Sequence, residues 1–330
     1  MRNQRLIIVI ILSLFFSTST AQDKFNSYKD VKKIPNGMNI IHDNDQTKAI
    51  VGIHGFYPVY WVEIYHEWVQ PFNLLIEEDI NTFFYKYDWN ECPSKVAKEF
   101  SIELQNLIEQ HPEVDDWQIV GHSMGGLHAK LQVVASGDHL WNAMARVPFD
   151  TVRMPSSIRA KIEPSLFFKP VTNVTRVVFI ATPHQGSSLA SLALGKIASL
   201  TVERPPELTA IHDQLVAENP GALRPEFEEA LPTTIQLLAP KSPLLEALYG
   251  LRPPCWVTIH NVIGVAHHTL RGERTDCIVS ESSARHPGAI SELDVKATHT
   301  GVHHKLTTIA EIERILQLHL IETGLRTTGR

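Results

Sequence analysis

The stretch that decides the fold is Gly121-His122-Ser123-Met124-Gly125, which has the pattern G-x-S-x-G. A strand-like apolar run over 117–120 leads into it, and helical spacing over 127–134 follows it. A serine at the tip of so tight a strand-to-helix turn has a strained backbone, and small residues on either side let strand and helix pass closely. We expect the turn to raise the Ser123 hydroxyl above the edge of a sheet, next to free N–H groups of the helix.

The rest of the chain alternates between apolar runs and helical spacing. Runs typical of buried strands cover 49–53, 82–87, 176–180, 257–265 and, more weakly, 293–297. Helical spacing covers 94–110 and 309–320. Continuously apolar strands that alternate with helices predict an α/β fold whose mostly parallel central sheet has helices on both faces. Segments 138–170 and about 187–253 break the alternation, and we expect them to be helical, cap-like excursions above the sheet within one domain.

The elbow-like turn resembles the nucleophile elbow of the α/β-hydrolase superfamily, and two further motifs come in that superfamily's order. The sequence Ile-His-Gly-Phe at 53–56 resembles its oxyanion loop. The sequence VFIATPHQGS at 178–187 is similar to the strand and TPH-x-GS turn of lipases and lipase-like esterases. Together these landmarks extend over about residues 48–320. The chain therefore resembles lipase-like bacterial serine esterases, which implies the α/β-hydrolase fold.

The resemblance also implies roles for the residues around the elbow. Ser123 would be the nucleophile, and the backbone N–H groups of Phe56 and Met124 would form the oxyanion hole. The residues that would support the elbow and this loop are His54, Gly55, Gly121, His122 and Gly125. His184 comes before any suitable acid in the chain, so it would organise its loop and would not be the base.

A catalytic serine needs a histidine to accept its proton and a carboxylate to hold that histidine. In the α/β-hydrolase superfamily the chain order is serine, acid, histidine. Asp276 follows the strand-like run 257–265, and its sequence Asp-Cys-Ile-Val resembles the family's D-G-x-V turn. Cys277 stands where the family has glycine, which is a departure from the pattern. Glu273 is the alternative acid.

Three histidines near the C-terminus compete for the role of the base. His299 directly follows the last strand-like run, and its His-Thr-Gly sequence resembles the family's histidine loop, whereas His303 and His304 remain alternatives. Two histidines four residues apart, His299 and His303, could instead bind a metal ion if they lay on a helix. Thr300-Gly301 argues against a helix, and the chain has no HExxH motif. We therefore predict no catalytic metal and no cofactor.

These residues predict a carboxylic ester hydrolase of the lipase or esterase type, which acts through an acyl-enzyme on small-molecule or lipid esters. An acyltransferase with the same triad, or a non-catalytic binding member of the fold, is the alternative. If the apolar clusters within 189–251 form a mobile cap, they would suit acyl chains and contact with a membrane surface. The alternative is that they pack permanently on the sheet. The net charge of −6, without a run of basic residues, argues against a nucleic-acid partner, and the oligomeric state stays open.

The N-terminus has the three-part pattern of a secretory signal peptide over residues 1–21. Two arginines precede an apolar run over 6–16, and Ser19 and Ala21 occupy the −3 and −1 positions of a cleavage site. The run is shorter than the roughly 20 residues that a membrane-spanning helix needs. We expect a mature domain over 22–330 that is secreted or periplasmic, with an uncleaved membrane tether as the alternative.

The chain has three cysteines, Cys92, Cys255 and Cys277. Export permits a disulfide, and three cysteines allow at most one bridge within the chain. Cys255 and Cys277 are the expected pair. The alternative is that all three are buried thiols.

Overall fold

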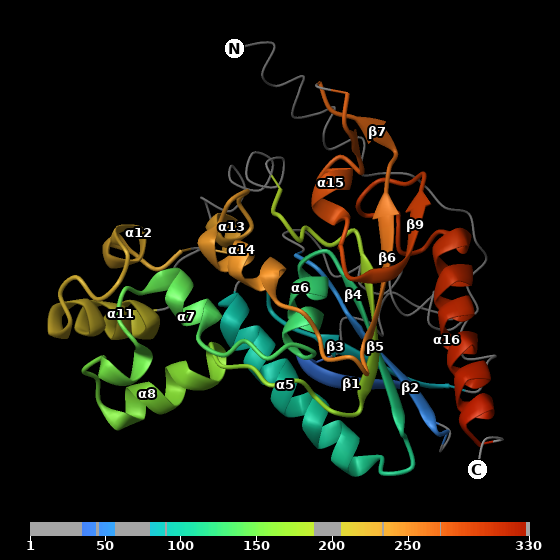
Figure 1. Ribbon diagram of the computed structural model, residues 1–330, viewed down its shortest axis with the longest axis horizontal. Helices are drawn as coiled ribbons and strands as arrows, with labels where there is room; N and C mark the ends of the chain where they lie inside the picture. Colours follow the sequence, from blue (N-terminus) through green and yellow to red (C-terminus); the bar gives the residue numbers. More distant parts are fainter. Residues whose placement is uncertain are drawn as a thin grey trace.

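A seven-stranded sheet forms the centre of the protein, with the strand order β1-β3-β2-β4-β5-β6-β9 (Figure 1). The computed structural model describes residues 35–43, 46–56, 80–89, 91–187, 206–232, 234–270 and 272–327. The strands are β1 (Gly37–His42), β2 (Lys48–Ile53), β3 (Asn81–Lys86), β4 (Asp116–His122), β5 (Val174–Ile180), β6 (Thr258–Gly264) and β9 (Ala289–Val295). All of them run parallel except β1, which pairs antiparallel with β3 at one edge. The predicted α/β class with a mostly parallel sheet is confirmed.

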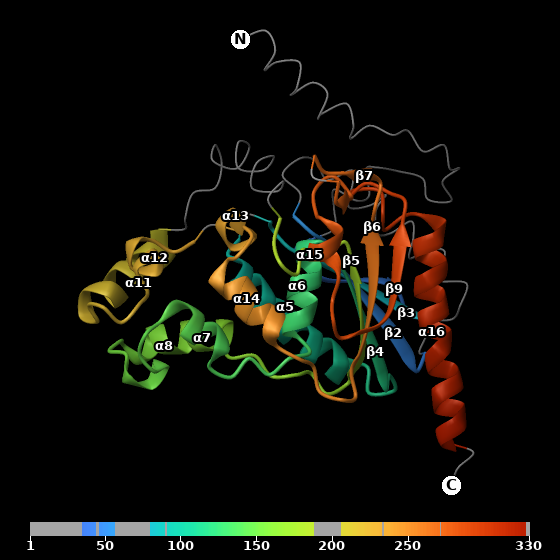
Figure 2. The same ribbon diagram turned by 45° about the horizontal axis from the view of Figure 1, so that its top comes forward.

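Both faces of the sheet are covered, which explains why its central strands are continuously apolar. The covering helices are α5 (Pro93–Gln110), α6 (Met124–Leu131) and α16 (Leu306–Thr327). Because successive side chains of a strand point to opposite faces, Val51 packs in the larger core cluster with α5 and α6, whereas Ile50 packs in a second cluster with α16. Figure 2 shows α5 and α6 on one side of the sheet and α16 on the other.

The two excursions from the α/β alternation pack against each other. Their helices are α7 (His139–Met144), η3 (Phe149–Thr151), α8 (Ser156–Ile162), η4 (Glu163–Ser165), α11 (Pro206–Glu218), α12 (Pro225–Glu229), α13 (Thr234–Leu237) and α14 (Pro243–Gly250). The Arg146 N–H donates to the Ala222 carbonyl and the Arg224 N–H to the Met144 carbonyl, each at 2.8 Å. We call these helices the helical region; it lies beside α5 and α6, away from α16 (Figures 1 and 2). The apolar run 192–200 lies outside the described residues.

Three small elements stand near the carboxyl ends of the last strands, namely β7 (His267–His268), β8 (Arg274–Thr275) and α15 (Glu281–Ala284). The expected disulfide is wrong, because all three cysteines are free thiols and Cys255 is exposed, not buried. Across the described residues, no helix is long and apolar enough to cross a membrane. The predicted signal peptide, 1–21, lies outside the described residues.

A buried lysine joins α6 to the helical region. The Lys130 Nζ atom lies 3.2 Å from the Tyr249 carbonyl oxygen, at the end of α14, and 3.2 Å from His286 Nε2. The Gly288 N–H donates to His286 Nδ1 at 3.1 Å, so a neutral His286 ring carries its proton on Nε2 and donates it to an uncharged Lys130 amine. Burial, reinforced by the positive charge of Arg252, lowers the pKa of Lys130 to about 7.

We expect this lysine to make stability rise with pH. Between about pH 7 and the ordinary lysine value of about 10.4, the unfolded chain binds a proton at Lys130 that the folded chain does not, so the free energy of unfolding increases with pH. Urea unfolding should show this rise in the wild type. In Lys130→Met, the increase in the free energy of unfolding between about pH 7 and 9.5 should be smaller by about 3 kcal/mol. The exposed Lys169→Met is the control and should keep the slope. An unchanged slope in Lys130→Met would contradict a neutral Lys130.

Candidate active site

Ser123 occupies the sharp turn between β4 and α6. Its backbone has φ 54° and ψ −126°, a conformation that costs a non-glycine residue about 1–3 kcal/mol. The Ser123 N–H donates to the Ile180 carbonyl at 2.8 Å, which ties the turn to the neighbouring strand β5. Helix α6 begins at Met124, directly after the serine, three residues earlier than the spacing of apolar residues predicts. The strained turn is thus held by the sheet on one side and by the helix on the other.

The glycines of the motif are required by close approach of backbones. A Cβ on Gly121 would lie 2.6 Å from the Cα of Gly126, where strand and helix pass each other. A Cβ on Gly125 would overlap the carbonyl oxygen of His54, at the end of β2. Neither position can hold a larger side chain unless the backbone moves. The G-x-S-x-G spacing therefore follows from how tightly the turn is packed between β4, α6 and β2.

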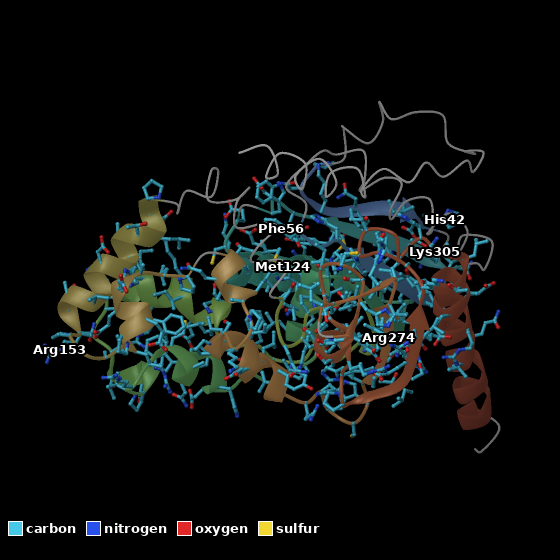
Figure 3. All side chains as sticks on the ribbon, turned by 90° about the horizontal axis from the view of Figure 1, so that it is seen from above. His42, Phe56, Met124, Arg153, Arg274 and Lys305 are labelled. Atoms are coloured by element: carbon cyan, nitrogen blue, oxygen red, sulfur yellow. The ribbon has the colours of Figure 1, made fainter. Side chains whose placement is uncertain are left out.

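The segment after β2 lies directly against the serine. A Cβ on Gly55 would lie 2.6 Å from the Cβ of Ser123, so only glycine fits at this contact. The next residue, Phe56, is half-buried and packs against the larger core cluster. Figure 3 labels Phe56, in the segment after β2, and Met124, the first residue of α6. The two residues whose N–H groups were predicted to form an oxyanion hole thus come from the segments on either side of Ser123.

His54 braces this segment from within the core. The Tyr87 N–H donates to His54 Nε2 at 3.1 Å, so the proton of the neutral ring is on Nδ1, from where it reaches the Gly55 carbonyl at 2.7 Å. The Tyr87 ring stacks on His54 at 4.1 Å, and its hydroxyl lies 2.9 Å from the His54 carbonyl oxygen. Burial lowers the pKa of His54 to about 4, so the ring stays neutral near neutral pH.

The structure brings Ser123, His299 and Asp276 together in a hydrogen-bonded line. His299 Nε2 lies 2.9 Å from Ser123 Oγ, and its Nδ1 lies 2.7 Å from Asp276 Oδ2. The other carboxylate oxygen of Asp276 accepts hydrogen bonds from the N–H groups of Ile278 and Val279, at 2.9 and 2.6 Å. Because an ionised carboxylate only accepts, the Nδ1–H of His299 points to Asp276. Its Nε2 is then free to accept the serine proton.

The alternatives from the sequence lie elsewhere. Glu273 is exposed and accepts hydrogen bonds from Ser282. The ring of His303 is buried, 4.3 Å from that of His122, and His304 is exposed. Cys277, in the place of the family's glycine, has φ 84°, the left-handed conformation that favours glycine.

His184 lies in the turn after β5, as the TPH motif predicts. Its ring is buried between the rings of Phe179 and His286, with centroids 4.6 and 4.8 Å away. Its N–H donates to the Ser283 carbonyl at 3.0 Å, so the residue joins the β5 turn to α15. Within the described ranges, no three histidine, cysteine or acidic side chains gather into a group that could hold a metal ion.

A cavity of about 510 Å³ extends from the first turn of α6 into the helical region. Its walls come from α5, α6, α7, α8, α11, α12, α13 and α14, and the apolar side chains among them include Met124, Leu127, Leu140, Leu215, Leu245 and Leu248. The sequence predicted apolar clusters in the second excursion, but it did not predict that α5 and α6 would form walls of the same cavity. Residues so far apart in the chain form one cavity only after folding.

No protein-family model matches the chain, and no curated protein sequence matches it. Among solved structures, it is similar to the mature lipase BlEst2 of Bacillus licheniformis, with 14% identity, a TM-score of 0.51, and coverage of 86% of this chain and 99% of that one. It also aligns with the esterase PF2001 of Pyrococcus furiosus (13% identity, TM-score 0.46, coverage 91% and 96%) and with EstA of Clostridium botulinum (13%, 0.46, 87% and 92%). The strand order, the turn at Ser123 and the likeness to BlEst2 agree: this chain has the α/β-hydrolase fold.

Proposed function

We propose that this protein is a serine hydrolase of carboxylic esters, with Ser123 as nucleophile, His299 as base and Asp276 as the acid that orients the base. The observation that carries the proposal is the continuous line of hydrogen bonds from Ser123 Oγ through the His299 ring to Asp276. A strained serine at a helix N-terminus, beside a glycine loop, supports it independently.

The reaction would proceed in two steps. Ser123 Oγ attacks the ester carbonyl carbon while its proton passes to His299 Nε2, and the alcohol then leaves with that proton. Water attacks the acyl-enzyme with His299 again as base, and the carboxylic acid and free serine are released. The N–H groups of Phe56 and Met124 would hold the oxyanion, and each such donor typically contributes about 3 kcal/mol to the transition state. The mechanism uses no cofactor.

For the substrate, we propose an ester with an apolar acyl group. The cavity begins at Met124, next to the nucleophile, and its described walls are mainly apolar, with leucine the commonest residue. The helical region would then be the cap of the site and could contact a lipid surface. The similar solved structures are named lipases and esterases, which agrees with this substrate class. We further propose that residues 1–21 direct export and that 22–330 form the mature hydrolase domain.

Ester hydrolysis and covalent labelling test the proposal. The purified protein should hydrolyse p-nitrophenyl butyrate, octanoate and laurate, and a fluorophosphonate should label Ser123. Leu248→Trp, which fills the cavity from α14, should lower turnover of the laurate ester at least about 10-fold more than that of the butyrate ester, because the long chain loses its space. Labelling of Leu248→Trp should persist as the control for an intact site.

The same assays distinguish the alternative functions. A protein that neither hydrolyses these esters nor reacts with the fluorophosphonate is not a serine hydrolase, and the binding alternative would then hold. Added short alcohols separate hydrolase from acyltransferase. A hydrolase releases mostly free acid, whereas an acyltransferase delivers most of the acyl group to the alcohol.

A further inference from the structure

We propose that His122, the residue before the nucleophile, is a positioning residue that holds the base His299 at its working distance. The inference rests on the proposed function of Ser123 and His299. The His122 side chain is buried, and its Nε2 lies 2.9 Å from the His299 backbone carbonyl oxygen. A carbonyl only accepts, so His122 carries a proton on Nε2 and donates it.

This hydrogen bond is one of two that hold the backbone of His299 in place. On one side, the His299 N–H donates to the Asp276 carbonyl at 2.9 Å. On the other side, the His299 carbonyl accepts from His122. The ring is held separately, by the contact between Nδ1 and the Asp276 carboxylate. His299 lies in a loop, between β9 and α16, so the sheet does not fix its backbone and these contacts do.

His122 is well placed for this role because it is covalently joined to Ser123. The bond to His299 therefore ties the loop of the base directly to the turn that carries the nucleophile, across 177 positions of the chain. A shift of about 1 Å between reacting groups can reduce a rate about 100-fold. A donor at position 122 keeps the separation of 2.9 Å between Ser123 Oγ and His299 Nε2 from drifting.

The surroundings keep the His122 ring uncharged over the working pH range. The ring is packed between those of His299 and His303, with centroids 4.9 and 4.3 Å away. Burial, together with the nearby His299, His304 and His54, holds the pKa of His122 well below its usual range. A neutral ring with its proton on Nε2 donates to His299 at any pH at which the base works.

Three variants test the role: His122→Leu removes the donor, His122→Gln places an amide N–H near the former Nε2, and His122→Asn carries the same amide too short to reach. We expect kcat for p-nitrophenyl butyrate to fall about 10- to 100-fold in the Leu and Asn variants. KM should change less than about 2-fold, because no substrate contact is lost. Fluorophosphonate labelling should slow in parallel with kcat, and the Gln variant should recover to within about 5-fold of the wild type.

Stability is measured on every variant, so that misfolding is not mistaken for lost positioning. His303→Leu, a change of the buried neighbour of His122, is the matched control and should keep kcat within about 3-fold. The proposal is overturned if folded His122→Leu has wild-type kcat, or if Gln is no better than Asn at equal stability. Ser123→Ala, assayed alongside, separates the two claims: if it stays active the proposed function itself fails, whereas an inactive Ser123→Ala beside a fully active His122→Leu removes only the positioning role.

Discussion

Ser123→Ala should lower kcat for ester hydrolysis about 10⁴-fold or more and leave the protein folded. The change removes the oxygen that forms the bond to the acyl carbon, and water must then attack the ester unaided by a covalent step. Alanine keeps the Cβ and the backbone hydrogen bond to Ile180, so the strained turn at φ 54° should form as before. Among the described residues, the contact that the change removes is the hydrogen bond between Oγ and His299. Steady-state hydrolysis of p-nitrophenyl esters and thermal unfolding measure the two effects.

Ser136→Ala is a matched control for that experiment. Ser136 is buried too, and its hydroxyl donates to the Leu166 carbonyl and accepts from the Phe168 N–H, each at 2.7 Å. Its loss should lower the free energy of unfolding by about 1–2 kcal/mol while kcat stays near the wild-type value. Ester hydrolysis by Ser123→Ala at more than a small fraction of the wild-type rate would remove Ser123 from the mechanism.

Asp276→Asn should reduce kcat about 10³- to 10⁴-fold. One carboxylate oxygen of Asp276 accepts two backbone N–H groups and the other faces the Nδ1–H of His299, so every contact needs an acceptor. An asparagine has only one acceptor oxygen. Its NH₂ group must therefore face either the backbone N–H groups of Ile278 and Val279 or the ring of His299. Facing the ring, the NH₂ group favours the His299 tautomer that carries its proton on Nε2. That tautomer cannot accept the serine proton.

Glu273→Gln is the control for the choice of acid. Its carboxylate is exposed and bound to Ser282, so the change should leave kcat within about 2-fold of the wild type. The pH dependence of kcat/KM, measured for both variants, shows whether the base still titrates normally. An active Asp276→Asn together with an inactive Glu273→Gln would transfer the role of the acid to Glu273.

Much of the fold was predictable because its strands are buried on both faces. Runs such as 49–53 and 177–180 are continuously apolar, and both lie in strands, β2 and β5. The antiparallel strand β1 was not predicted, since it lies at the sheet edge, is only half-buried and mixes apolar with polar residues. The start of α6 was predicted too late for a different reason. Glycines and a methionine at its first turn give no apolar spacing, and the helix begins there because β4 ends directly before Ser123.

The candidate site, like the fold, was only partly predictable from the sequence. The motif at 121–125 pointed to Ser123 because close packing demands glycines at fixed positions, a constraint that is visible in any one chain. Which carboxylate and which histidine lie beside that serine was left open by the order of residues, and the disulfide expected between Cys255 and Cys277 was wrong. The contacts of the acid, the base and the cysteines depend on how loops from distant parts of the chain pack together.

By itself, the sequence determined the class of the sheet, the turn at Ser123 and the segments that surround it, because buried strands and tight turns restrict which residues can occupy each position. Only the tertiary structure decided that the His299 ring lies between Ser123 and Asp276, that the His122 ring contacts the His299 carbonyl, and that helices from distant parts of the chain line one cavity. These groups are up to 177 residues apart in the chain. Their distances are set by the packing of whole elements, for which local sequence contains no signal.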